Sequence, residues 1–140
     1  MWNMIWPMAL VVVSNSIYHV VAKETAPQAN AFLSLTVTYL VAAGISAVLF
    51  LGGGQAALLP ELKKLNWATV AMGLAVVGLE LGYICLYRAG WKVSLGALIA
   101  NILLACVLLA VGVLLYKEVV TLCQLVGMAV CALGLFLVCK

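Results

Sequence analysis

The chain is poor in charge. Among 140 residues there are only 4 acidic and 7 basic side chains, so 8% of the sequence is charged and 68% is hydrophobic. A soluble domain has about 25% charged residues. This composition excludes an ordinary water-soluble domain. The net charge of +3 is small and scattered along the chain, which argues against nucleic acid as a partner.

Other features are missing as well. The cysteines form no Cys-x-x-Cys motif and no Cys/His cluster, so we expect no disulfide, no metal site and no other cofactor. The first residues lack Lys and Arg, the basic region of a cleavable signal peptide, so we expect a retained first segment. Neither a nucleophile–base pair nor a His-Glu-x-x-His motif is present, and we do not expect an enzyme.

Long apolar runs dominate what is there. Charges and turn residues divide the chain into five apolar segments, at Asn3–Ala22, Ala29–Leu51, Trp67–Arg88, Val93–Leu115 and Val120–Cys139. Each is about 20 residues long, which a helix needs to cross a hydrocarbon core of about 30 Å. The segments lack the alternation of a membrane β-barrel. The sequence therefore predicts an all-α, multi-pass membrane protein with one domain, residues 1–140.

The connections between the segments differ in length. Gln55–Asn66 holds a proline and three charged side chains, and we interpret it as a surface loop. The links at 89–92 and 116–119 are short, so the helices on either side of each link should be antiparallel neighbours.

Basic residues are almost evenly divided between the two membrane faces. Five crossings would put Lys63, Lys64 and Lys117 on one face, and Lys23, Arg88, Lys92 and Lys140 on the other. The positive-inside rule therefore does not indicate which of the two faces is cytoplasmic. Either the topology is not readable from charge, or the protein inserts both ways and pairs with an inverted copy. The chain has no internal repeat, so one copy would supply half of such an inverted pair.

Glu80 is the one acid deep inside an apolar segment. A charged carboxylate costs roughly 2.5–3.5 kcal/mol at the centre of a membrane helix, so such a residue is a functional-site hypothesis by default. At about 1.5 Å per residue, Glu80 lies about 12 Å from one membrane face. Asn15, Thr38 and Asn101 lie at nearly the same depth, so four segments each place a polar residue near the midplane.

Helical spacing groups further polar side chains. Glu80, Tyr83 and Tyr87 share one stripe, and Asn15 is followed at helical spacing by Tyr18 and His19. We expect substrate contacts from Glu80, Asn15, Tyr83, Asn101, Tyr87 and His19, and proton exchange at Glu80. The alternatives are structural. Glu80 would then lock helices as a neutral hydrogen-bonded acid, the asparagines would bond between helices, and His19 would be interfacial.

Small residues follow one face of the last segment. Gly127, Cys131 and Gly134 stand at i, i+4 and i+7. Such faces let helices approach closely in lipid, where van der Waals packing drives association. We expect this face to form the interface between protomers, although packing within one protomer remains an alternative.

Two stretches resemble a known family. Tyr87 to Ala97 (Tyr-Arg-Ala-Gly-Trp-Lys-Val-Ser-Leu-Gly-Ala) resembles the turn between helices three and four of an EamA-type repeat. Leu114 to Thr121, followed by Gln124 to Gly127, resembles the next turn and the start of helix five. Ala22 and Lys23 followed by Pro27 are similar to the end of the first helix. These repeats belong to the drug/metabolite transporter superfamily, which includes the small multidrug resistance transporters.

The resemblance implies a function. Family members usually join two inverted five-helix repeats in one chain, so a single repeat implies an inverted homodimer. We expect a secondary transporter of small organic solutes, with cationic or amine-bearing solutes as candidates, working by alternating access in the cytoplasmic (inner) membrane. The related exporters carry a glutamate on helix one, where this chain has Asn15 and His19 but no acid. A non-transporting subunit, a half-transporter that needs a partner and a lipid-carrier flippase are the alternatives.

Overall fold

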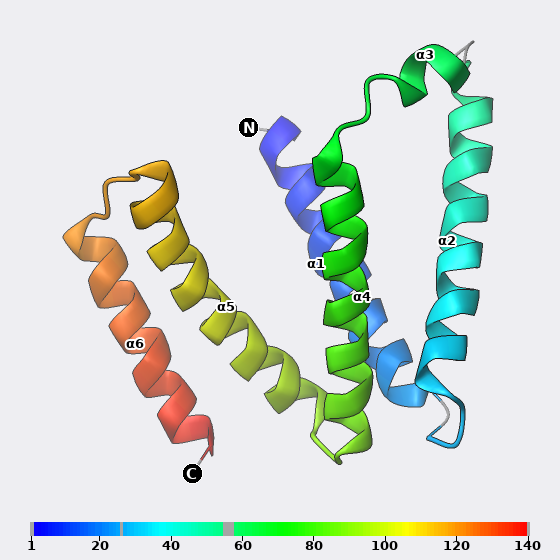
Figure 1. The fold of residues 1–140 in the computed structure, drawn as a ribbon. Coiled ribbons are helices and arrows are strands. Elements are labelled where there is room, and N and C mark those ends of the chain that lie inside the picture. Colours follow the sequence, from blue (N-terminus) through cyan, green and yellow to red (C-terminus); the bar gives the residue numbers. More distant parts are fainter. Residues whose placement is uncertain (1, 26, 55–57, 140) are drawn as a thin grey trace. The chain divides into compact units, whose positions relative to one another are not determined.

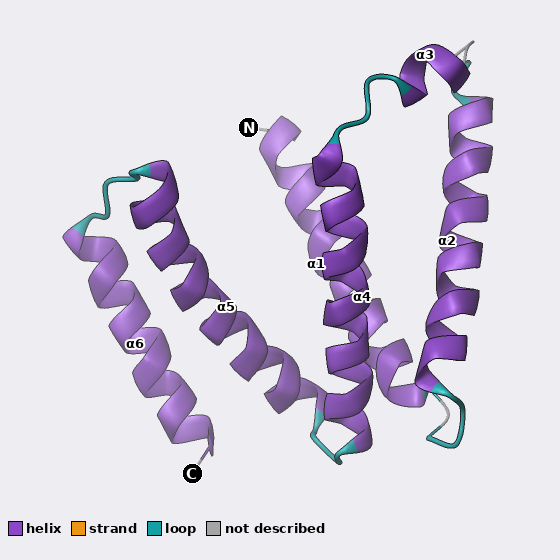
Figure 2. Cartoon of the chain, in the orientation of Figure 1, coloured by secondary structure: helices purple, strands orange, loops and turns teal. Residues whose placement is uncertain are grey.

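The computed structural model describes residues 2–25, 27–54 and 58–139, and within these ranges the chain is all α-helical, with no strand (Figure 1, Figure 2). The helices are α1 (Trp2–Glu24), α2 (Ala31–Gly52), α3 (Leu58–Leu62), α4 (Trp67–Arg88), α5 (Val93–Tyr116) and α6 (Leu122–Cys139). The predicted all-α class is confirmed. The apolar segments become helices because a helix satisfies its backbone hydrogen bonds internally, which lipid requires.

Four helices are long and apolar enough to cross a membrane. They are α1 from Ile5 onward, α2, α4 and α5. The protein is therefore a multi-pass membrane protein by the length and composition of its helices. The fifth predicted span corresponds to α6, which is equally apolar but shorter, because residues 117–121 lie outside any helix. Five crossings remain a prediction.

The predicted loop at 55–66 contains one helical turn that the sequence did not reveal. Residues 55–57 are outside the described part, and Leu58–Leu62 form α3. Pro60 is tolerated there because it stands in the first turn, where its missing N–H has no partner to lose. Lys64 forms an exposed ion pair with Glu61 at 2.6 Å.

Asparagine side chains set where two membrane helices begin. Asn30 Oδ1 accepts hydrogen bonds from the backbone N–H groups of Phe32 and Leu33, at 2.9 and 3.3 Å. Asn66 Oδ1 accepts one from the N–H of Ala68 at 3.1 Å. These bonds satisfy N–H groups that have no partner inside the helix. The ends of α2 and α4 are thus fixed by local sequence.

The chain divides into two compact units, Met1–Arg88 and Ala89–Lys140. In the first unit α4 contacts both α1 and α2, whereas the described residues of α1 and α2 make no such contact with each other. Arg88 Nη2 donates a hydrogen bond to the carbonyl of Ala29 at 2.8 Å, which ties the end of α4 to the α1–α2 link. Helix α4 therefore packs against both α1 and α2 and holds the first unit together.

Few side chains of the first unit are buried. Leu35 of α2 and Ile84 and Tyr87 of α4 are 4–6% exposed, and His19 of α1 is 5% exposed. Most other described apolar side chains are open to their surroundings. In lipid this exposure carries no hydrophobic penalty, because the hydrocarbon tails are as apolar as the side chains.

The second unit is a pair of helices. Figure 1 shows α5 and α6 side by side and antiparallel, as the short link between them predicted. Helix α5 ends at Lys117, whose φ of 55° is left-handed. Thr121 and Gln124 then start α6 with reciprocal bonds: Gln124 Oε1 accepts from the N–H of Thr121 at 2.8 Å, and Thr121 Oγ1 accepts from the N–H of Gln124 at 3.3 Å. This is a capping box.

Candidate functional site

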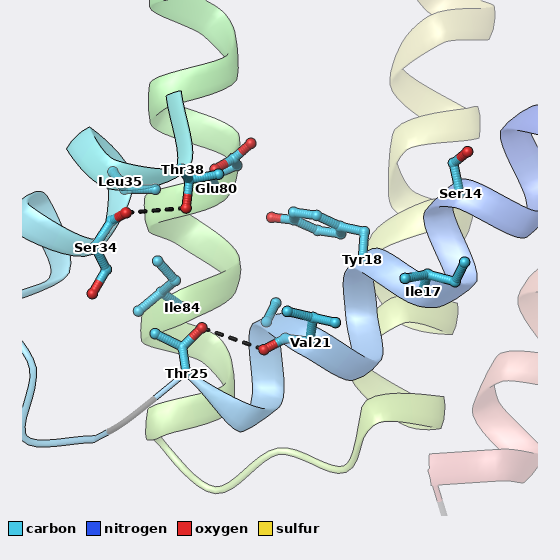
Figure 3. Close-up of a pocket in the computed structure, with 11 residues that line it drawn as sticks. Ser14, Ile17, Tyr18, Val21, Thr25, Ser34, Leu35, Thr38, Glu80 and Ile84 are labelled. Carbon is cyan, nitrogen blue, oxygen red and sulfur yellow. Dashed lines mark hydrogen bonds between the residues drawn. The ribbon is translucent and has the colours of Figure 1, made fainter. Parts of the chain in front are cut away.

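A cavity of about 290 Å³ lies between α1 and α2, with α4 behind it (Figure 3). We call it the α1–α2 cavity. It is lined by Ser14, Ile17, Tyr18, Val21, Ala22, Thr25, Ser34, Leu35, Thr38, Glu80 and Ile84. The cavity lies where the backbones of α1 and α2 both approach α4 but not each other.

Glu80 supplies the only charged side chain among those lining residues. It is partly buried on α4, one helical turn before the buried Ile84. Figure 3 shows Tyr18 extending from α1 across the cavity toward Thr38 and Glu80. The carboxyl interacts electrostatically with the hydroxyls of Tyr18 and Tyr39, so α1 and α2 both present a phenol to it.

Next to the cavity, α1 and α4 share a cluster of aromatic rings. His19 lies with its ring centroid 4.7 Å from that of Tyr83 and 6.2 Å from that of Tyr87, edge to face in both cases. Tyr83 and Tyr87 stack at 6.0 Å, and Tyr18 meets Tyr83 edge to face at 5.8 Å. The Tyr87 hydroxyl and His19 Nδ1 form a buried hydrogen bond of 2.9 Å. This cluster holds α1 against α4 and so fixes where Tyr18 enters the cavity.

Three polar atoms in this region are buried without a hydrogen-bond partner among the described residues. They are Tyr18 Oη, His19 Nε2 and Tyr39 Oη. Tyr39 Oη has the Glu80 carboxyl as its neighbour, on the adjoining helix. Most buried polar groups in native proteins are paired, and exceptions call for an explanation. A polar ligand, a water molecule or a change in helix packing would satisfy them.

The structure brings four of the six predicted contact residues into this region. Glu80 lines the cavity, and His19, Tyr83 and Tyr87 form the adjoining cluster. Asn15 is exposed on α1 and is not among the lining residues. Asn101 is exposed on α5, in the second unit, while the cavity is built from the first unit alone.

The sequence placed Thr38 at the depth of Glu80 but did not indicate Thr38, Tyr18 or Ser34 as contact residues. Tyr18 was noted only as a neighbour of Asn15, and Ser34 and Thr38 are residues that commonly bond to their own helix. The available signal was spacing: Ser34, Leu35 and Thr38 fall on one face of α2, at the depth that the Glu80 argument had already marked.

The small residues of α6 are exposed within the second unit. Gly127 and Cys131 line a shallow hollow together with residues of α5, and a Cβ added at Gly127 or Gly134 would meet nothing within 4 Å. The face is therefore open enough to accept another helix. Across the described part of the chain, no three His, Cys, Asp or Glu side chains gather as metal ligands would.

Comparison of the chain with protein-family models, with curated proteins and with solved structures finds no match. The similarity to EamA-type repeats thus rests on the short stretches of sequence quoted above.

Proposed function

We propose that the protein is a secondary transporter of small organic solutes that works by alternating access. The observation that carries this proposal is the position of Glu80, a carboxyl on a membrane-spanning helix that faces the α1–α2 cavity. An ionisable group at membrane depth is costly, and those that persist commonly mark solute or proton pathways. Glu80 is the residue at which a proton and a solute would exchange.

The packing of the first unit suits a moving part. The backbones of α1 and α2 approach that of α4 but not each other in the described structure, and few side chains are buried between the helices. Elements that move during function are drawn from regions with few buried contacts. Opening and closing of the cavity would require α1 or α2 to shift on α4, with the two helix interfaces otherwise kept.

An inverted homodimer in the cytoplasmic membrane completes the proposal. The even division of basic residues permits insertion in both orientations, and the apolar faces of α5 and α6 leave room for a second copy. Two oppositely inserted copies would create the inverted symmetry from which many transporters build their central site. Similarity to EamA-type repeats, which normally occur as inverted pairs, supports the same arrangement.

Flux across reconstituted membranes tests this function. Proteoliposomes on a solid-supported membrane would be exposed to a panel of amines, amino acids and sugars while transported charge is recorded under an imposed pH gradient. We expect a solute-dependent current in the wild type, its loss in Glu80→Gln, and no change in Glu61→Gln, which alters an exposed acid on α3.

Two outcomes would contradict the proposal. Undiminished, still pH-coupled transport by Glu80→Gln removes Glu80 from the mechanism. A second protein that co-purifies in stoichiometric amount, with no flux in its absence, assigns the chain to the class of partner-dependent subunits instead.

A further inference from the structure

Three hydroxyls on the cavity wall have already used their hydrogens, those of Thr38, Ser34 and Thr25. Thr38 Oγ1 donates to the carbonyl of Ser34 at 3.0 Å, Ser34 Oγ to that of Asn30 at 3.2 Å, and Thr25 Oγ1 to that of Val21 at 3.3 Å. A hydroxyl has one hydrogen and two lone pairs. These three side chains therefore offer only hydrogen-bond acceptors to the cavity (Figure 3).

Glu80 adds a further acceptor to this wall. An ionised Glu80 carboxylate accepts hydrogen bonds and donates none. The Tyr18 hydroxyl is buried without a partner among the described residues, so its oxygen is available as an acceptor and its hydrogen as a donor. No Lys, Arg or His is among the described lining residues. The ligand that best complements this lining is a cation that carries several N–H donors.

Size and apolar lining limit the rest of the ligand. Ile17, Val21, Leu35 and Ile84 add apolar surface from all three helices. The volume of about 290 Å³ is at the small end for ligand sites, which run from about 300 to 1,000 Å³. The wall thus fits a short apolar body attached to one polar, donor-rich head.

We propose that the α1–α2 cavity recognises the protonated primary amine of a small organic solute. Its N–H groups donate to the carboxylate of Glu80 and to the hydroxyl oxygens of Thr38 and Tyr18. A quaternary ammonium keeps the charge but has no N–H, so it leaves the acceptors unpaired. This inference rests on the proposed transport function and names its substrate class.

Binding to the purified full-length protein in detergent tests the inference. The probes are 2-phenylethylamine, its N,N,N-trimethyl derivative and 2-phenylethanol, measured by isothermal titration calorimetry and saturation-transfer NMR. We expect the primary amine to bind at least about tenfold tighter than either analogue, since hydrogen bonds to charged groups are worth about one such factor or more each.

Three variants separate the contributions of charge and of hydrogen-bond acceptors to the binding affinity. Glu80→Gln keeps the side-chain shape, removes the charge and should abolish the preference of amine over alcohol. Thr38→Val removes one hydrogen-bond acceptor at nearly constant side-chain volume. It should reduce the factor by which the primary amine binds more tightly than the trimethylated amine. Glu61→Gln, the same chemical change on exposed α3, should leave all three affinities unchanged. Size-exclusion chromatography of each variant checks folding, and Thr38→Val serves if Glu80→Gln does not fold.

Equal affinity for the two ammonium probes, tighter binding of the trimethylated one, or no binding of the primary amine would overturn the inference. A flux measurement distinguishes failure of the amine-binding inference from failure of the proposed transport function. Selective binding without flux of 2-phenylethylamine leaves the site in place and refutes transport of this class. Flux of other solutes without amine selectivity leaves transport in place and refutes the amine site.

Discussion

Tyr87 Oη lies 2.9 Å from His19 Nδ1, and both side chains are buried at the interface of α1 and α4. The two residues are 68 positions apart in the chain. This bond joins the two helices beside a cluster of aromatic rings. It anchors α1 beside the cavity, directly next to Tyr18.

Loss of this bond should weaken the first unit. Tyr87→Phe removes the hydroxyl and leaves both ring nitrogens of His19 without a partner in the described structure, which should lower the free energy of unfolding by about 1–3 kcal/mol. Thermal unfolding in detergent measures this. The matched control is Tyr116→Phe, at a side chain that is 74% exposed. Equal stability of the two variants would show that the bond contributes nothing.

The close packing of the Ile84 side chain should contribute more to the free energy of unfolding than its apolar character does. Ile84→Ala opens a void between α4 and α2, whereas Ile45→Ala shortens a side chain that is 58% exposed. Because lipid replaces the lost contacts only at the exposed site, Ile84→Ala should cost about 1–2 kcal/mol more than Ile45→Ala. Chemical unfolding in mixed micelles compares them, and a reversed order would contradict the described packing.

The capping box should control the start of α6. Thr121→Ala breaks the bond that Thr121 Oγ1 accepts from the N–H of Gln124, which should cost about 0.5–2 kcal/mol locally. Faster amide hydrogen exchange in the first turn of α6 would report it. Thr36→Ala is the control, because Thr36 bonds only the Phe32 carbonyl of its own helix. Unchanged exchange at α6 after Thr121→Ala would rule the cap out.

Insertion in both orientations has a direct signature. In a background without the five native cysteines, Lys64→Cys and Lys92→Cys each place one thiol in a link at an opposite end of α4. We expect an impermeant thiol reagent to label each site from both membrane faces. Ile45→Cys, inside α2, should resist labelling from either face. Labelling of each link from a single face would exclude the inverted homodimer.

Much of the fold could be predicted, because hydropathy and length identify membrane helices directly. The four spans begin and end within a few residues of the predicted segments, and Asn30 and Asn66 mark two of the starts. The short helix α3 was missed because five residues give too little periodicity to recognise. The length of α6 was overestimated because the capping box at Thr121 begins the helix later than hydropathy indicates.

Helical spacing predicts which side chains of one helix share a face, but it does not predict which side chains of different helices meet. Glu80, Tyr83 and Tyr87 share a stripe of α4 because helical spacing alone requires it. Depth counting marked Asn15 and Thr38 equally, yet only Thr38 lines the cavity. Depth is set by the rise per residue, whereas the direction in which a side chain points depends on how each helix is rotated about its axis.

The sequence by itself determined a multi-pass helical membrane protein with one acid, Glu80, deep in an apolar segment, since composition and length decide what enters lipid. Only the tertiary structure decided that Tyr18, Thr38 and Glu80 share a cavity and that His19 meets Tyr87. The physical reason is that these helices are apolar on every face. Amphipathic patterning therefore does not fix their rotation, and close packing of individual side chains does.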